Sequence, residues 1–235
     1  MCTLSSDLKD LLFCPLDLPT PPEINYDDFC EWRQEQSEFN RKYNFTAALA
    51  DGKQSYPWEV AWALWWNTYK KPNPWIADFD RRFPELVEYI EKYPFSVKKS
   101  ISFLDQKQSR DVYLHTDPDA RWGMRFYLFN GLGEKLYFVR SKSQLDSRLK
   151  TMEDGRYQDL WESSQKEKLY AEFPETRCAW MLNSYRAFHG IDSNPNPQGN
   201  RVTCVLIGEY DYPRLFKLLE QSSVKYKDYA IWWKN

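Results

Sequence analysis

The sequence predicts a mainly β protein, an antiparallel sandwich or barrel with helices covering one sheet. Apolar residues repeat at helical spacing up to about residue 93 and at every second position thereafter. Short strand-like runs separated by turn-forming residues follow, and the last run, 201–210, is apolar on both faces. At 235 residues the chain fits one domain of this kind. We divide it into a helical N-terminal support (1–94), a β core (95–211) and a C-terminal helix (212–235).

Composition narrows the classes of function. The chain carries 32 Lys and Arg against 34 Asp and Glu, so no overall positive field favours nucleic acid. No apolar run reaches the length of a membrane span, and the first residues lack the pattern of a signal peptide. We expect a soluble, cytoplasmic protein without membrane or nucleic-acid partners. The five cysteines include no CxxC pair, so buried thiols are expected rather than a structural zinc site.

Four helices are expected in the N-terminal part. A short one spans about Ser6–Phe13, before a proline-rich connector, and an amphipathic one runs from Tyr26 to about Tyr43. Pro57 suits the first turn of a third, in which Trp58, Ala61, Trp62, Trp65, Trp66 and Tyr69 form one stripe. That stripe is more typical of core packing than of a substrate-stacking platform. Pro84–Tyr93 is the fourth, and Pro94 closes the section.

Strands are expected from about residue 97 onwards. They cover 97–103, 112–115, 124–129, 135–140, 177–183, 185–189 and 201–210, with a turn at 130–133 and a loop rich in proline and asparagine at 192–200. The last helix starts after Asp211. The segment 141–174 is an insertion in this pattern. It is either a solvated helical excursion or a mobile lid with a hinge at Asp154-Gly155.

The chain contains only two histidines, and each lies at the end of a strand-like run. Because residues two apart on a strand share a face, Tyr113, His115 and Asp117 are expected to face one interior. By the same rule His189 shares a face with Ala187. Two imidazoles and one carboxylate form the ligand set of non-haem Fe(II) oxygenases. The alternative is that both histidines are ordinary strand-end residues.

A basic residue and a hydroxyl follow on the next strand, at Arg201 and Thr203. The short connection predicts that this strand neighbours the strand of His189. An arginine inside an apolar barrel is costly unless it meets an anion, and a guanidinium binds a carboxylate in a bidentate manner. With Asp117 assigned to the metal, a bound dicarboxylate is the expected partner. The alternative is that Arg201 is a surface charge.

These residues resemble the Fe(II)- and 2-oxoglutarate-dependent dioxygenase superfamily. Its pattern of HxD, a distal His, and an Arg followed by x-Ser/Thr is met by residues 115–117, 189 and 201–203. The runs 125–130 and 133–138 further resemble the strand pair after HxD in the prolyl 4-hydroxylase-like branch. They lack that branch's doubled glycine and its Thr before Phe, so its substrate is not carried over. The likeness spans about residues 95–211.

The resemblance implies a double-stranded β-helix, a jelly-roll or cupin-like barrel, with the N-terminal helices packed on one sheet. It implies one Fe(II) held by His115, Asp117 and His189, and 2-oxoglutarate held at its far carboxylate by Arg201 and Thr203. O2 is the oxidant, succinate a product, and ascorbate a further candidate cofactor. Additional cosubstrate contacts are expected from Tyr113 and Arg125, and weaker candidates for substrate or cosubstrate contact are Tyr127, Trp122, Trp180 and Asn183.

The implied activity is hydroxylation of a C–H bond in a small molecule, such as an amino acid or a biosynthetic intermediate. Related halogenases have a small residue in place of the acidic ligand, so Asp117 favours hydroxylation over halogenation. A hydroxylase of protein or peptide side chains is the alternative enzyme. A cupin-like binding protein without turnover is the alternative from another class.

Overall fold

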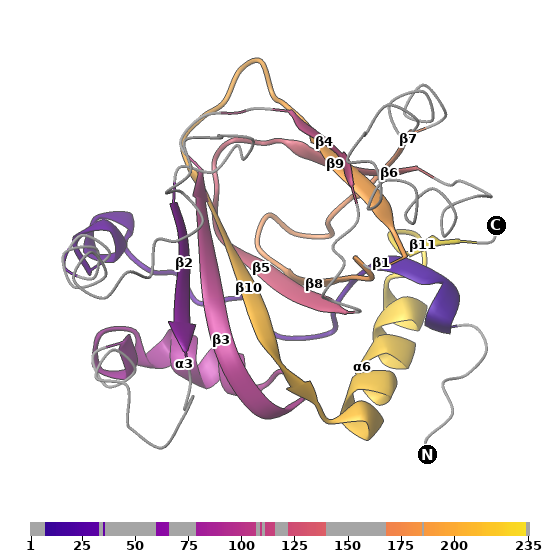
Figure 1. Ribbon diagram of the computed structural model, residues 1–235, viewed down its shortest axis with the longest axis horizontal. Coiled ribbons are helices and arrows are strands. Elements are labelled where there is room, and N and C mark those ends of the chain that lie inside the picture. Colours follow the sequence, from indigo (N-terminus) through magenta and orange to yellow (C-terminus); the bar gives the residue numbers. More distant parts are fainter. Residues whose placement is uncertain are drawn as a thin grey trace, which may run out of the picture.

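Two antiparallel sheets form the centre of the molecule (Figure 1). The computed structural model describes residues 8–32, 35, 60–65, 79–106, 109, 111–115, 122–139, 168–184 and 186–233. The large sheet has the order β11-β1-β8-β5-β10-β3-β2, with β1 at Leu11–Pro15, β2 at Val60–Trp65, β3 at Phe95–Gln106, β5 at Gly123–Asn130, β8 at Ala179–Leu182, β10 at Arg201–Tyr210 and β11 at Ile231–Trp232. The small sheet has the order β4-β9-β6-β7, with β4 at Val112–His115, β6 at Lys135–Val139, β7 at Lys168–Tyr170 and β9 at Phe188–Asp192.

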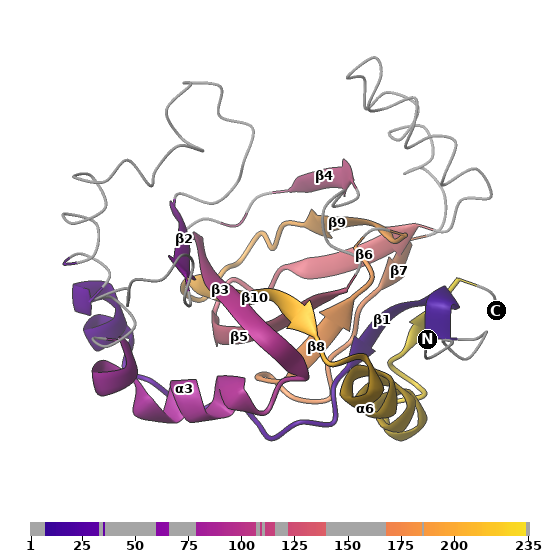
Figure 2. The same ribbon diagram turned by 60° about the horizontal axis from the view of Figure 1, so that its bottom comes forward.

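The helices lie on one side of the large sheet and the small sheet on the other (Figure 2). They are α3 at Pro84–Glu91, α6 at Tyr212–Lys225, the 3-10 turn η1 at Leu8–Asp10 and helical stretches over 26–32 and 79–82. Proline stands in the first turn of both α3 and α6, where a missing N–H costs nothing. The Asn25 side chain accepts hydrogen bonds from the backbone of Asp27 and Asp28 and caps the stretch 26–32.

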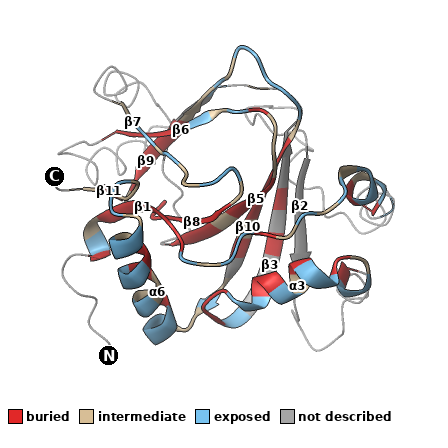
Figure 3. Cartoon of the chain, turned by 180° about the vertical axis from the view of Figure 1, so that it is seen from behind, coloured by how far each residue is buried: buried red, intermediate tan, exposed pale blue. Residues whose placement is uncertain are grey.

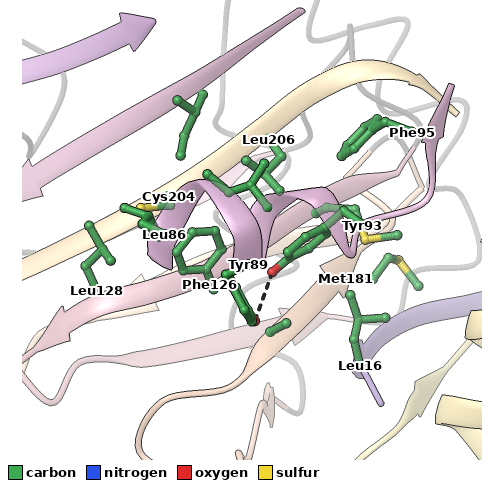
Figure 4. Close-up of a cluster of buried hydrophobic side chains, with 14 of the residues drawn as sticks. Leu16, Leu86, Tyr89, Tyr93, Phe95, Phe126, Leu128, Met181, Cys204 and Leu206 are labelled. Atoms are coloured by element: carbon green, nitrogen blue, oxygen red, sulfur yellow. Dashed lines mark hydrogen bonds between the residues drawn. The ribbon is translucent and has the colours of Figure 1, made fainter. Parts of the chain in front are cut away.

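Alternation along β10 separates the two sides of the large sheet. Val202, Cys204 and Leu206 are buried in the cluster that packs against the helices, which also includes Phe126 of β5. Figure 4 shows this cluster, in which Tyr89 and Tyr93 of the α3 region lie against Phe126. The outer faces of α3 and α6 are exposed (Figure 3). This side of the sheet is therefore a packed core.

The opposite face of the large sheet packs on the small sheet. A second buried cluster joins Phe13 of β1, Tyr127 of β5 and Trp180 of β8 to Leu136 and Phe138 of β6. The rings of Phe13 and Phe138 are 5.7 Å apart across the two sheets. Any site inside the barrel must be built from the residues that share this face.

Two helix predictions in the N-terminal part are wrong. Of the segment expected to be helical over Ser6–Phe13, Leu8–Asp10 is a 3-10 turn and strand β1 begins at Leu11. Of the tryptophan-rich segment, 60–65 is a strand that pairs with β3. Both runs are continuously apolar, a pattern that does not distinguish a short strand from a buried helix. Pairing with a neighbouring strand satisfies the backbone of each, and the support 1–94 thus contributes two strands to the large sheet.

Most other elements agree with the sequence. The strands at 112–115 and 201–210 have the predicted bounds, the turn at 130–133 joins β5 to β6, and α3 and α6 are helices. The expected helix over 26–43 is present over 26–32 and at Glu35, while 36–43 lie outside the described residues. Of the insertion 141–174, only 168–174 are described, so the lid and its hinge at Asp154-Gly155 are untested. No helix in the described ranges combines the length and apolarity needed to cross a membrane.

Candidate metal and anion site

The two histidines of the chain meet across strands β4 and β9. His115 is directly opposite His189 in the antiparallel register of the small sheet. Directly opposite residues of an antiparallel pair lie on the same face. On its other side His189 is opposite Phe138, which belongs to the cluster between the sheets. The backbone register therefore places positions 115 and 189 on one face of the small sheet, the face that carries Phe138.

The ring of His189 is buried, and its Nδ1 forms a hydrogen bond with the backbone. His189 is only 6% exposed, and its Nδ1 lies 2.9 Å from the carbonyl oxygen of Ala187. Because a carbonyl can only accept, Nδ1 carries the proton and the lone pair of the neutral ring is on Nε2. Histidines that bind metals usually donate their other N–H in this way, which fixes tautomer and ring orientation. His189 thus fits the role of a metal ligand through Nε2.

The remaining ligand predictions fall largely outside the described residues. Asp117 is not described, and for Tyr113 and His115 only the backbone of β4 is. Within the described part of the chain, no three His, Cys, Asp or Glu side chains gather as a metal site. The triad therefore stays a prediction, supported by the backbone pairing of two of its members.

Arg201 and Thr203 lie at the start of β10 and are buried, at 7% and 6% exposure. They alternate with Val202 and Cys204, which face the helices, so they occupy the face turned to the small sheet. Thr203 is opposite Tyr127 of β5, a member of the cluster between the sheets. The interior placement predicted for both residues follows.

The strand of Arg201 does not neighbour the strand of His189, contrary to the sequence prediction. β9 pairs with β4 and β6 in the small sheet, whereas β10 pairs with β3 and β5 in the large one. The connecting loop crosses from one sheet to the other. It is held to the β5–β6 turn by a hydrogen bond from the Asn194 side chain to the Leu132 carbonyl, 2.9 Å, and from the Gln198 backbone N–H to the Gly131 carbonyl, 2.8 Å.

The guanidinium of Arg201 has a counter-ion within the chain. Its Nη1 forms an ion pair with Oε2 of Glu134, and the two side chains are 8% and 0% exposed. Sequence reasoning looked for this anion in a ligand and missed Glu134. The sequence shows only that Glu134 directly follows the turn 130–133. The register of the large sheet, in which Asn130 is opposite Arg201, brings the end of that turn to the guanidinium.

Tyr127 and Arg125 complete the polar part of the interior. Burial raises the pKa of Tyr127, Arg201 opposes this rise, and Glu134 adds to it. These effects require that the phenol lies near both members of the ion pair. The Arg125 guanidinium lies 5.4 Å from the centre of the Trp180 ring. A Cβ at Gly123 would come within 2.6 Å of Arg125 Nη1, so glycine leaves room for this guanidinium.

Two of the weaker candidates, Trp122 and Asn183, make contacts that hold elements of the fold together. Trp122 is buried in the cluster on the helix side, and its carbonyl accepts a hydrogen bond from Tyr210. The Asn183 side chain donates to the Leu11 carbonyl at 3.3 Å and links β1 to the end of β8. Trp180, by contrast, lies between the sheets with Tyr127.

The chain is similar in structure to Fe(II)- and 2-oxoglutarate-dependent oxygenases. HygX from Streptomyces hygroscopicus with nickel and 2-oxoglutarate bound aligns with a TM-score of 0.40 and 13% identity, over 86% of this chain and 84% of that one. SnoK, a non-haem α-ketoglutarate-dependent carbocyclase from nogalamycin biosynthesis, aligns with a TM-score of 0.41 and 11% identity, over 87% and 83%. A prolyl hydroxylase from Trichoplax adhaerens in complex with a hypoxia-inducible-factor peptide aligns with a TM-score of 0.36 and 11% identity, over 86% of this chain and 84% of that one.

Neither a protein-family model nor a curated protein matches the sequence. At these TM-scores and identities, the likeness to solved structures assigns no activity to the chain.

Proposed function

We propose that this protein is an Fe(II)- and 2-oxoglutarate-dependent oxygenase. The observation that carries the proposal is the pairing of His115 with His189 across β4 and β9, on the face of the small sheet that meets the large one. The bond from His189 Nδ1 to Ala187 supports it, because it leaves the lone pair on the nitrogen that would bind the metal. The third ligand of the proposal is Asp117.

We further propose that the barrel is a double-stranded β-helix. Its support is the order of the strands from β3 to β10. Successive strands change sheet at every step except the hairpin β6–β7, and the resulting orders are β8-β5-β10-β3 and β4-β9-β6-β7. Two interlocked Greek keys of eight strands produce this alternation in jelly-roll folds. In this arrangement the start of β10 and the start of β9 contribute to one interior.

The residues of the interior have distinct roles in the proposed reaction. His115, Asp117 and His189 would hold Fe(II), and Arg201 with Thr203 would bind the far carboxylate of 2-oxoglutarate. Bound there, Fe(II) and 2-oxoglutarate would supply the oxidation of a substrate C–H bond by O2, with release of CO2 and succinate. The carbonyl of Ala187 keeps the proton of His189 on Nδ1.

The aromatic wall around the site limits the access of water. Phe138 lies beside His189 with ring centres 6.4 Å apart, and Tyr127 and Trp180 pack on each other at 5.8 Å. All three are less than 6% exposed. Exclusion of water strengthens electrostatic interactions in the site and suppresses side reactions. The substrate that we propose is a small molecule hydroxylated at carbon, with a peptide side chain as the alternative.

The test is anaerobic addition of Fe(II) and 2-oxoglutarate to metal-free protein. We expect a visible charge-transfer band, and succinate once air is admitted. His189→Ala should lose both, whereas Leu136→Ala, another buried residue facing the interior, should keep the band because it holds no ligand. Absence of both band and succinate in the unaltered protein would sink the proposal. Mass gain of one oxygen, screened over small molecules and intact peptides, then separates the two substrate classes.

A second candidate function, a binding barrel without turnover, is favoured by one observation. Arg201 already has a buried carboxylate partner in Glu134, so the site is electrically satisfied without a cosubstrate. Such a protein would bind a ligand but form no succinate with Fe(II), 2-oxoglutarate and air. The same experiment therefore distinguishes the two functions.

A further inference from the structure

The ion pair between Arg201 and Glu134 lies where the proposed function requires a ligand carboxylate. Arg201 is the cation expected to bind the far carboxylate of 2-oxoglutarate, and Glu134 presents a carboxylate to its Nη1. Thr203, whose hydroxyl is expected to bind the same carboxylate, follows two residues later on the same face of β10. The chain thus supplies the same chemical group that the cosubstrate would bring.

Burial makes the two carboxylates competitors. The Arg201 and Glu134 side chains are 8% and 0% exposed, so water screens their charges weakly. A ligand carboxylate that approached Arg201 with Glu134 in place would meet a like charge at close range. Leaving Arg201 without any anion is also costly, since a buried charge deprived of its partner destabilises the fold. One carboxylate on Arg201 is favourable and a second is not.

The main chain at Glu134 lies at the surface of the molecule. The residue as a whole is partly exposed although its side chain is fully buried, so its main chain reaches the surface. Gly133 before it has a positive φ of 60°, in the region that favours glycine. The turn itself is fixed by the hydrogen bonds of Gly131 and Leu132 to the 194–200 loop. Rotation of one side chain would therefore move the carboxylate into solvent while the turn stays in place.

We propose that Glu134 determines the affinity and specificity of the Arg201 anion site. Its carboxylate occupies the position of the ligand's far carboxylate and is displaced when a dicarboxylate binds. The inference rests on the proposed function for the identity of the ligand, 2-oxoglutarate. A ligand must bring its own carboxylate to Arg201 to displace Glu134, so a 2-oxo acid without a far carboxylate is rejected.

Replacement of the competing charge provides the test. Glu134→Gln keeps the size of the side chain and removes its charge, so succinate and 2-oxoglutarate should bind metal-free protein at least about tenfold more tightly, as measured by calorimetry. Binding of 2-oxobutyrate, which lacks the far carboxylate, should not change. The matched control is Glu175→Gln, an exposed carboxylate that accepts a hydrogen bond from Thr20 and should leave all affinities unchanged. Equal or weaker binding of both dicarboxylates to Glu134→Gln would overturn the proposal.

Stability gives a second readout. Glu134→Gln should unfold at a lower temperature than the unaltered protein, and succinate should restore its unfolding temperature by supplying the missing anion. Glu134→Asp shortens the side chain by one methylene group and should give an intermediate gain in succinate affinity. If Glu134→Gln stays unfolded in succinate, or Glu134→Asp binds succinate less tightly than the unaltered protein, Glu134 is not a displaceable group and the proposal is wrong.

The two proposals fail in different ways. Succinate binding to metal-free protein requires neither iron nor turnover, so the comparison of Glu134→Gln with the unaltered protein decides the role of Glu134. The charge-transfer band and succinate formation decide the oxygenase. A tighter succinate site without any band would keep the role of Glu134 and remove the oxygenase.

Discussion

Phe138 connects the stability of the barrel to the orientation of the proposed metal ligand. It is fully buried on β6, directly opposite His189, and its ring lies 5.7 Å from that of Phe13 and 6.4 Å from that of His189. Phe138→Ala should lower the free energy of unfolding by about 3 to 5 kcal/mol, because buried phenylalanine truncations cost that much. The His189 ring also loses the wall that fixes it, so we expect about a tenfold loss of divalent-metal affinity, the scale of changes in groups that orient metal ligands.

Phe103→Ala is the matched control for this prediction. Phe103 is equally buried, but it faces the helices and packs on Phe29 and Trp32. Urea unfolding should show a comparable loss of stability for both variants, while metal titration should show weaker binding only for Phe138→Ala. Equal metal affinities in the two variants would refute the idea that Phe138 orients His189. A cost below about 1 kcal/mol for Phe138→Ala would contradict the packing described between the sheets.

Further predictions concern the helix cap of α6, the thiol of Cys14 and the turn at Gly131. Asp211→Ala should lower the free energy of unfolding by about 1 kcal/mol in urea titrations, because the Asp211 carboxylate caps α6 by accepting from the Arg214 backbone N–H at 3.2 Å. Burial raises the pKa of Cys14 to about 12, so peptide mapping should show almost no alkylation of this thiol at pH 8 in folded protein. Because the pKa of Cys14 in the folded protein lies above its ordinary value, the free energy of unfolding should fall as pH rises from about 9 to 12. Gly131→Ala should weaken succinate binding, since a Cβ there would come within 2.9 Å of the Gly199 Cα and separate the two loops that flank the anion site; an unchanged Kd in calorimetry would contradict this.

The strands were predictable where short runs of apolar, β-branched and aromatic residues are bounded by turn-forming residues. The apolar run 201–210, bounded by a loop and by Asp211, predicted the extent of β10, and the two-residue period of a strand placed Arg201 and Thr203 on one face. The scarcity of histidine made position 189 a candidate before any geometry was known. Local periodicity and residue chemistry were sufficient for these features.

Other features depend on contacts that local periodicity does not encode. The six apolar residues of β2 have no polar face, so their pairing with β3 rather than a helical packing is decided by the tertiary structure. The crossing of the 193–200 loop between sheets separates β9 from β10 despite their closeness in sequence. The partner of Arg201 likewise came from a turn 67 positions earlier, at Glu134. A cation in the interior indicates an anion but not its source.

The proposed function requires His115 and His189 to bind the same divalent metal ion. X-ray absorption at the iron edge of protein loaded anaerobically with Fe(II) tests it most directly, because the spectrum reports the number of imidazoles on the metal. We expect two imidazoles in the unaltered protein and one in His189→Ala. A spectrum with one imidazole or none in the unaltered protein would show that the two histidines do not share a metal ion.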